Sequence, residues 1–257
     1  MTCVGWFTPS AQAGAWNQKA GEGLIITTSG WFHADDLFQD DTVRVDFLGY
    51  TKSETRIWIE SGLTKKLTFV GNTAYQDLDY RDDLSRITYQ GLDDIELGMQ
   101  WQFKRKEGLA AAIRASYIID SGLDNRFPDV QSNGDTVEFR ALLGQSKETL
   151  IGDFFHDTQV AIRVDTLGIF DSIHGTTTLG YKPTDRWSVM AQGFADYTEN
   201  LATDGSRDQV RSQISGQLSL VHQFKPGRYA QLGGKLTLDG RNAVKERALI
   251  IGVWTEY

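Results

Sequence analysis

The chain has 257 residues, of which 40% are apolar, and its net charge is -8 with a pI of about 5.0. The acidic balance argues against nucleic-acid binding, and the absence of any run of about 18 apolar residues excludes a transmembrane helix. The single cysteine, Cys3, excludes an internal disulfide and a multi-cysteine metal site.

The N-terminal residues predict the remnant of a secretory signal. Ala11, Gln12 and Ala13 form a small-x-small pattern of the kind that signal peptidase cleaves, and a short apolar stretch, 3–7, precedes them. We expect the true start of the signal to lie upstream and the mature chain to begin near Gly14. The signal remnant is then 1–13 and the folded domain 14–257. A disordered soluble N-terminus is the alternative.

The remainder of the chain consists of segments in which apolar and polar residues alternate with a period of two. Short turns and longer polar loops separate the segments in strict succession, a pattern typical of outer-membrane barrels. Closure of a barrel satisfies every backbone group, and polar lumen residues lower the mean hydropathy. The sequence therefore predicts an all-β fold, a transmembrane antiparallel up-and-down β-barrel of about twelve strands, at 22–32, 42–62, 67–76, 91–103, 108–120, 136–145, 155–165, 172–181, 187–198, 209–223, 229–239 and 247–257.

The segment 42–62 reads either as one strand or as two. Val43, Val45, Phe47, Ile57 and Ile59 all share odd phase, so one long strand needs no change of face. One strand also keeps the total even, which leaves both termini in the periplasm. The residues 77–90 that follow the next strand are predicted to form one of the longer loops.

The strand faces and the membrane interfaces follow from the same alternation. In 91–103, residues such as Leu97 and Trp101 face lipid, while Asp94, Glu96 and Gln100 face the lumen. Aromatic residues gather near both ends of the strands, as they do at membrane interfaces. The predicted girdles contain Trp101, Phe103, Tyr181, Trp187, Phe224, Tyr229 and Tyr257 near the short turns, and Trp31, Tyr75, Tyr117 and Tyr197 near the long loops.

The last strand indicates location and partners. Small or apolar residues occupy every second position from Leu249 onward, and the chain ends on the aromatic Tyr257. This is the pattern of a terminal strand in a bacterial outer-membrane barrel. We expect the outer membrane as the location, with its lipid and lipopolysaccharide as partners. We also expect the barrel assembly machinery to engage the strand that ends at Tyr257.

Several stretches carry a family resemblance. The segments 59–69, 91–98, 179–187 and 240–254 resemble the outer-membrane proteins grouped as "meta-pathway of phenol degradation" barrels. The similarity covers most of the chain after Gly21 and consists of turn and strand signatures. It implies an outer-membrane barrel that passes small molecules, aromatic ones among them, and it brings no catalytic residue with it.

Charged side chains of both signs are predicted around the lumen. They favour a narrow hydrated pore whose charges select solutes. The alternative is a wall of paired charges that fills and rigidifies the interior. The predicted pore-lining residues are Arg44, Asp46, Arg56, Glu60, Asp94, Glu96, Arg114, Glu138, Arg140, Arg163, Asp165, Asp196, Arg211 and Lys235.

Candidates for catalysis are few. His174 and Thr176 share a predicted face, with Asp165 or Asp196 as orienting carboxylates, but a lipase needs its nucleophile exposed to lipid and this face is luminal. The sequence shows no phosphate loop or clustered metal site, so we expect no enzyme activity, no cofactor and no metal. A passive channel for small solutes is the favoured function. The alternatives are a non-conducting surface barrel that binds a partner or lipid through its loops and, third, a lipid-modifying enzyme.

Overall fold

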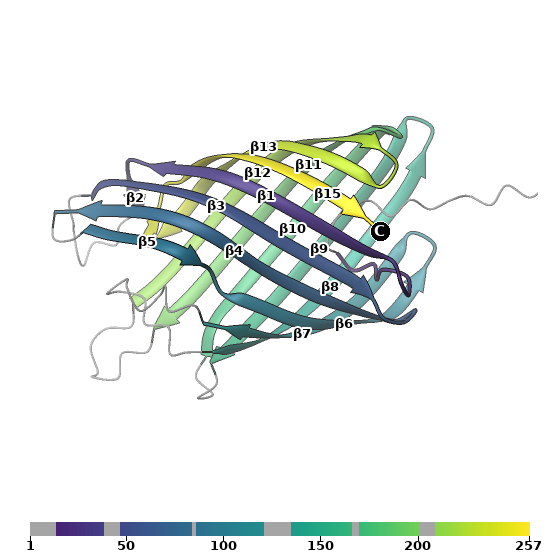
Figure 1. Cartoon of the computed structure of the whole chain (residues 1–257), viewed down its shortest axis with the longest axis horizontal. Helices are drawn as coiled ribbons and strands as arrows, with labels where there is room; N and C mark the ends of the chain where they lie inside the picture. The colour runs from purple at the N-terminus through teal and green to yellow at the C-terminus, as the bar shows by residue number, and fades with distance from the viewer. Residues whose placement is uncertain (1–13, 39–46, 84–85, 121–134, 166–169, 201–208) are drawn as a thin grey trace, which may run out of the picture.

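The computed structural model describes residues 14–38, 47–83, 86–120, 135–165, 170–200 and 209–257. These residues form a closed antiparallel barrel of 12 strands, as the sequence predicts (Figure 1). The barrel strands are β1 (Gly23–Ala34), β3 (Phe47–Gly62), β4 (Leu67–Asp82), β5 (Arg86–Leu92) continued by β6 (Ile95–Lys106), β7 (Leu109–Ile119), β8 (Thr136–Thr149), β9 (Gly152–Asp165), β10 (Phe170–Thr184), β11 (Trp187–Asn200), β12 (Gln209–Lys225), β13 (Arg228–Arg241) and β15 (Arg247–Glu256).

Two pairings complete the topology. β5 and β6 are pieces of one barrel strand, since both pair with β4, one after the other. The two-residue strands β2 (Leu37–Phe38) and β14 (Ala243–Val244) pair with each other in a separate small sheet. Each remaining strand pairs with its neighbours in the chain, which is the up-and-down order.

The first and last strands close the barrel. β1 pairs with β3 on one side and with β15 on the other. Gly23 N donates to Tyr257 O at 2.9 Å, and Tyr257 N donates to Gly23 O at 3.0 Å. A Cβ at residue 23 would lie 2.3 Å from Cζ of Tyr257, so glycine is needed there for the terminal ring to pack. Through this seam each of the 12 barrel strands is paired on both sides over part of its length, as a membrane interior requires.

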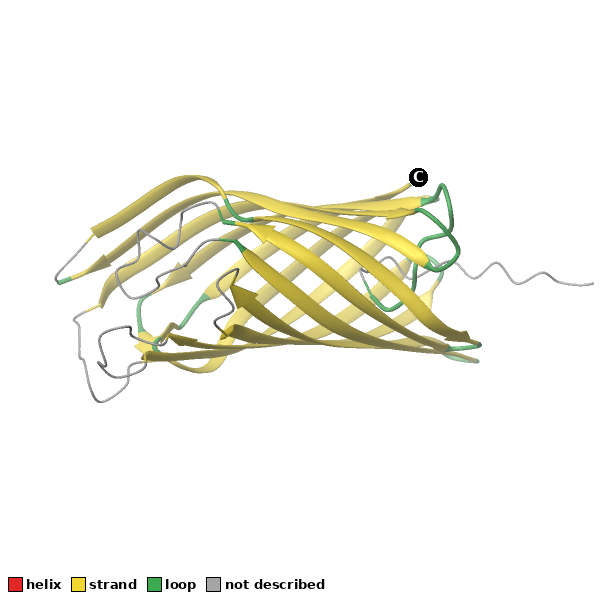
Figure 2. Cartoon of the chain, turned by 90° about the horizontal axis from the view of Figure 1, so that it is seen from below, coloured by secondary structure: helices red, strands yellow, loops and turns green. Residues whose placement is uncertain are grey.

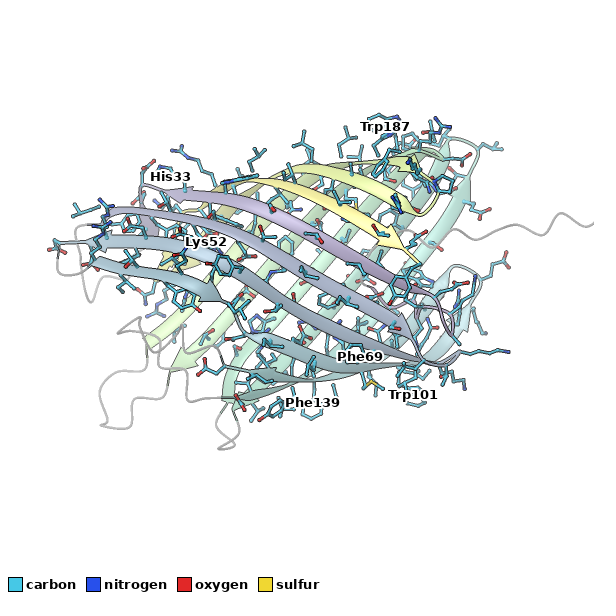
Figure 3. The ribbon with its side chains drawn as sticks, viewed as in Figure 1. His33, Lys52, Phe69, Trp101, Phe139 and Trp187 are labelled. Atoms are coloured by element: carbon cyan, nitrogen blue, oxygen red, sulfur yellow. The ribbon has the colours of Figure 1, made fainter. Side chains whose placement is uncertain are left out.

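The two faces of the strands differ as predicted. Leu97, Met99 and Trp101 of β6 are exposed, whereas Glu96 and Gln100 between them are buried. In Figure 3 the labelled aromatic side chains of Trp101 and Phe139 point away from the barrel. The exposed apolar residues form an outward-facing belt, as expected of a barrel that spans a membrane. No helix of membrane-crossing length and apolarity occurs in the described ranges.

The predicted girdles are confirmed with one exception. Trp187, Phe224 and Tyr197 are exposed at strand ends. Tyr229 is the exception, because it faces the lumen and packs against the buried Trp254, at a centroid distance of 5.9 Å. Tyr229 also donates a hydrogen bond to Glu256 at 3.2 Å. Tyr229 faces inward because it has the same phase along β13 as the buried Gln231.

The prediction of a loop at 77–90 is wrong. β4 continues to Asp82 and β5 begins at Arg86, so this part of the chain is a hairpin that extends the barrel wall (Figure 1). Leu78 is buried on the inner side, while Asp79 points outward and pairs with Arg81 and Arg86. The hydrogen bonds from Arg81 and Arg86 hold the pKa of Asp79 well below its usual range. Apolar side chains inside and charged ones outside are the polarity expected of a wall in contact with water.

The strand 47–62 is single, but its phase changes once. The register shifts between Phe47 and Gly49, where Gly49 has a φ of 141°. The extra residue turns Phe47 inward, where its ring lies 5.6 Å from that of Tyr80. The prediction that Phe47 keeps the phase of Ile57 is therefore wrong, because a bulge reverses the face. Residues 42–46 lie outside the described part of the chain.

We expect Leu218→Lys to reduce the folding free energy in lipid by about 2 to 4 kcal/mol, the cost of a lysine at mid-membrane on the lipid face. Leu218 is 62% exposed in the middle of β12. The matched control is Gln192→Lys, one strand away in the adjacent register but facing the lumen. Urea titration in vesicles measures both. Equal costs for the two variants would contradict the assignment of faces.

Candidate functional site

A short N-terminal segment occupies one end of the lumen. Residues 14–20, called the plug, precede β1 at the end of the barrel that also carries the C-terminus (purple in Figure 1). Figure 2 shows the C-terminus beside the loops of that end. Gly21 N donates to Gly62 O at 2.9 Å, which fixes the exit of the plug beside the short turn after β3. Ala15 is 0% exposed and Asn17 is 5% exposed, so the first part of the plug lies inside the wall, whereas Lys19 is exposed.

Hydrogen bonds tie the plug to three strands. Ala15 N donates to Asp157 Oδ2 on β9 at 2.9 Å. Two glutamines of β6 donate to plug carbonyls, Gln100 to Gly14 O at 2.9 Å and Gln102 to Ala15 O at 2.8 Å. Further along the plug, its Gln18 donates to Glu60 on β3 at 2.8 Å. The plug therefore contacts the wall from β3 to β9.

Small wall residues make room for the plug. Ala15 and Trp16 pack against Ala110, Ala112 and Leu142 on β7 and β8. A Cβ at Gly144 would lie 2.3 Å from the ring of Trp16, so only glycine allows the indole to approach the wall there. The fit between these small residues and the tryptophan orients the plug.

The opposite wall at this end is apolar. Leu24, Met190, Val221 and Trp254 form a buried cluster from β1, β11, β12 and β15. Phe155, Ile26 and Tyr229 pack against it. The plug lies along one side of the lumen, and this apolar cluster lies on the wall across from it. We therefore expect the lumen to be narrowest at this end.

A buried ion cluster lies on β8 and β9. Glu138 is 0% exposed and accepts hydrogen bonds from Arg140 Nε at 2.7 Å and from Arg163 Nε at 3.0 Å. Arg140 also donates to Gln159 at 3.2 Å. Two arginines share one carboxylate here, so this part of the wall carries a net positive charge.

A second cluster surrounds Arg114 on β7. Its guanidinium lies 4.9 Å from the ring centroid of Trp58 and 3.8 Å from Glu96 Oε1. Glu96 accepts from Ser116 at 2.8 Å, and Glu60 accepts from Trp58 at 3.2 Å. Acidic and basic side chains thus lie near one another on the inner face of this part of the wall.

Water is needed between the plug and the wall. Thr68, Gln100 and Arg114 lie side by side in the register of β4, β6 and β7. Thr68 Oγ1, Gln100 Oε1, Arg114 Nε and Asn17 Nδ2 are buried without a hydrogen-bond partner among the described residues. Buried polar atoms of this kind are usually satisfied by water. We infer that the interface of plug and wall is hydrated.

The lumen toward the long loops is open to solvent. The side chains of Arg56, Arg163 and Asp196 face inward, yet 35%, 29% and 45% of their surface is exposed. Arg56 pairs with Glu54 at 2.9 Å and with Asp93 at 2.7 Å. The side chains of the described residues therefore do not fill the lumen at this end.

Neutral polar side chains line the wall from β10 to β13. Gln217 donates to Gln192 Oε1 at 3.0 Å, and Gln192 donates to Thr178 at 3.4 Å. Gln231 donates to Ser219 at 2.9 Å on the next pair of strands. These hydrogen bonds form a ladder of uncharged groups along that side of the lumen.

The structure places most of the predicted lumen residues on the inner face. Lys235 lies there over the ring of Phe194, at 5.1 Å, and Arg211 lies on the inward phase near the start of β12. Asp94 sits in the break between β5 and β6, and its neighbour Asp93 makes the ion pair with Arg56. Arg44, Asp46 and the side chain of Asp165 lie outside the described residues.

The sequence reasoning missed Glu54, Asp93, Asp157 and the whole plug. Successive side chains of a strand point to opposite faces, and Asp157 and Arg163 of β9 are separated by an even number of positions. Asp157 is therefore expected to face the lumen, as Arg163 does. The plug has no such signal, because its residues follow no period.

A Ser–His–Asp arrangement also faces the lumen. His174 Nε2 lies 2.8 Å from Ser172 Oγ, and His174 Nδ1 lies 2.6 Å from Asp196 Oδ1. The sequence pointed to Thr176 as the hydroxyl partner of His174, and the structure gives this place to Ser172. Ser172 is 2% exposed. In the part of the chain that the structure describes, no three His, Cys, Asp or Glu side chains are grouped as metal ligands.

Comparison with known proteins gives the fold. No family model matches the chain, nor does the sequence of any curated protein. The structure is similar to that of the COG4313 outer membrane channel from Pseudomonas putida F1, with a TM-score of 0.71 and 12% identity over 96% of this chain and 99% of that one.

Two further solved structures are similar. The NanC porin has a TM-score of 0.54 and 11% identity over 90% of this chain and 98% of that one. The translocator domain of the autotransporter NalP from Neisseria meningitidis has a TM-score of 0.53 and 12% identity, covering 93% of this chain and 89% of that one. The chain therefore has the fold of outer-membrane β-barrels, channels and porins among them.

Proposed function

We propose that this protein is a passive outer-membrane channel for small solutes, narrowed at its periplasmic end by the plug. The observation that carries the proposal is the solvent exposure of inward-facing charges, above all the 45% exposure of Asp196. A barrel filled by its own side chains would bury such groups. The likeness to an outer membrane channel supports the same function.

The lining favours small polar organic molecules, with aromatic ones included. Toward the long loops, Tyr50, Leu78 and Tyr89 form a buried cluster on the inner side, with Phe32 packed against it. Lys52 Nζ lies 4.2 Å from the centroid of Phe32. Lys52 is also paired with Glu54 at 3.1 Å, so aromatic rings lie here beside a neutral ion pair, which suits small polar aromatic solutes. Membership in the phenol-degradation barrel family is part of this proposal.

We expect the purified protein to conduct ions in planar bilayers and to let small solutes swell liposomes. The conductance should be modest, because the plug occupies part of the lumen. Lys235→Gln should shift the permeability ratio toward cations, since it removes a luminal positive charge. Gln145→Lys, near the periplasmic turn after β8, adds an exposed charge outside this part of the lumen and serves as control. A folded protein without ion or solute flux would reject the channel and favour a surface barrel that binds partners through its loops.

The Ser172–His174–Asp196 arrangement favours a second candidate, ester hydrolysis. The contacts of His174 match those of a general base between a nucleophile and an orienting carboxylate. The burial of Ser172 opposes the idea, because a substrate must reach Oγ. We therefore propose that the three residues are a structural part of the wall. Labelling of Ser172 by a fluorophosphonate would reverse that conclusion.

The partners proposed for the channel are those of its membrane. Lipid and lipopolysaccharide surround the apolar belt, and the barrel assembly machinery engages the β15 strand that ends at Tyr257. The exposed ring of Tyr257 and the position of β15 at the closing seam support the second of these.

A further inference from the structure

We propose that cleavage of the Ala13–Gly14 bond creates an α-ammonium group at Gly14, and that this group pairs with the buried carboxylate of Asp157 to hold the plug in the lumen. Processing would then complete the plug. The proposal concerns how the plug is fixed, and it stands whether or not solutes pass through the barrel.

The geometry begins with the closeness of Gly14 to Asp157. A Cβ built on Gly14 would lie 2.7 Å from Oδ2 and 3.2 Å from Cγ of Asp157. The nitrogen of Gly14 is bonded to the same Cα, so it lies within about 5 Å of that oxygen. A side chain at this position would displace the carboxylate, whereas glycine leaves room for it.

The charge of Asp157 points to a missing cation. Asp157 is 5% exposed and accepts hydrogen bonds from Ala15 N at 2.9 Å and Gln159 Nε2 at 2.7 Å. Both donors are neutral, and no ion pair of Asp157 occurs among the described residues. A buried carboxylate is stable when a cation pairs with it. The new N-terminus would supply that cation at the right place.

The backbone around Gly14 is already fixed for this contact. Gln100 Nε2 donates to Gly14 O, and Gln102 Nε2 donates to Ala15 O. Trp16 is seated over Gly144 on β8. The freed nitrogen therefore needs only to rotate about the Gly14 Cα–C bond to approach Asp157.

The covalent step is a hydrolysis by signal peptidase. Water adds to the carbonyl carbon of Ala13, the bond from that carbon to Gly14 N breaks, and Ala13 leaves with a carboxylate. Gly14 N takes up protons and becomes an ammonium group. The small-x-small pattern of Ala11 and Ala13 is what this class of peptidase cleaves.

The first test is the N-terminus of the protein isolated from outer membranes. Intact mass and N-terminal sequencing should give a chain that begins at Gly14. A mature chain that begins at any other residue would overturn the proposal, because its ammonium group would not lie beside Asp157.

The second test measures the reactivity of that amine. Reductive methylation of the Gly14 α-amine should be several-fold slower in the parent protein than in Asp157→Asn, with surface lysines as the internal reference. Asp196→Asn is the matched control, since it removes a luminal carboxylate that pairs with His174 away from the plug. This control should leave the amine as slow as in the parent.

If Asp157→Asn does not fold, a substitution of Gly14, the other residue of the proposed ion pair, tests the same contact. Gly14→Ala leaves the wall unchanged and places a methyl group against the carboxylate, so it should also speed methylation. Trypsin should cleave after Lys19 faster in both variants, because the plug leaves the lumen more often. A parent amine as reactive as that of both variants would overturn the ion pair.

Discussion

Deletion of residues 14–20 should raise the single-channel conductance several-fold. The plug contacts the wall from β3 to β9 at the end where the opposite wall is apolar. Its removal frees the narrowest part of the lumen, and β1 still pairs with β3 and β15 from Gly23 onward. Planar-bilayer recordings of the deletion variant and the parent measure the change.

Lys19→Ala is the control for that deletion. Lys19 is exposed, and its ion pair with Glu22 lies at the surface. We expect the conductance of this variant to equal that of the parent. If the deletion also left the conductance unchanged, the plug would not be the constriction.

Glu138→Gln should lower the free energy of unfolding by about 3 to 5 kcal/mol, the usual cost of breaking a buried ion cluster from one side. Glu138 is 0% exposed and is the shared partner of Arg140 and Arg163. The neutral amide leaves two guanidinium groups without their carboxylate. Urea titration in lipid vesicles, followed by tryptophan fluorescence, gives the value.

Arg163→Gln provides the comparison within the same cluster. Its side chain is 29% exposed, and Glu138 keeps Arg140 when Arg163 is removed. The loss should therefore be clearly smaller than for Glu138→Gln. The reverse order would show that the cluster is not organised around Glu138.

The strand faces were predictable because lipid and lumen impose a period of two. In β6 the contrast between exposed Leu97 and buried Glu96 follows directly from the sequence. The pattern fails where the surroundings change. Above the membrane Leu78 faces inward and Asp79 faces water, so the hairpin has inverted polarity and resembles a polar loop in sequence.

The plug was not predictable, because its position depends on the wall. Its residues show no periodicity, and its hydrogen bonds go to side chains far along the chain, such as Gln100 and Asp157. An indirect signal exists in the inward positions Ala110, Ala112 and Gly144. Small residues at three neighbouring inward positions leave space that another part of the chain must fill.

The sequence predicts on which face of the wall each charged side chain lies, but it does not predict which residue that side chain pairs with. Parity places Arg56, Arg140 and Arg163 in the lumen, but the pairing of Arg56 with Asp93 depends on the break between β5 and β6. The same limit applies to Ser172, whose contact with His174 follows from side-chain orientation within β10.

The most direct measurement is current block at cysteines placed on the polar ladder of β11. In a background in which Cys3 is replaced by alanine, a positively charged thiol reagent should reduce the single-channel current of Gln192→Cys. It should leave the current of Ala191→Cys unchanged, because Gln192 faces the lumen and the exposed Ala191 faces lipid. Block of Ala191→Cys, or an unaltered current through modified Gln192→Cys, would contradict a solute path through the lumen.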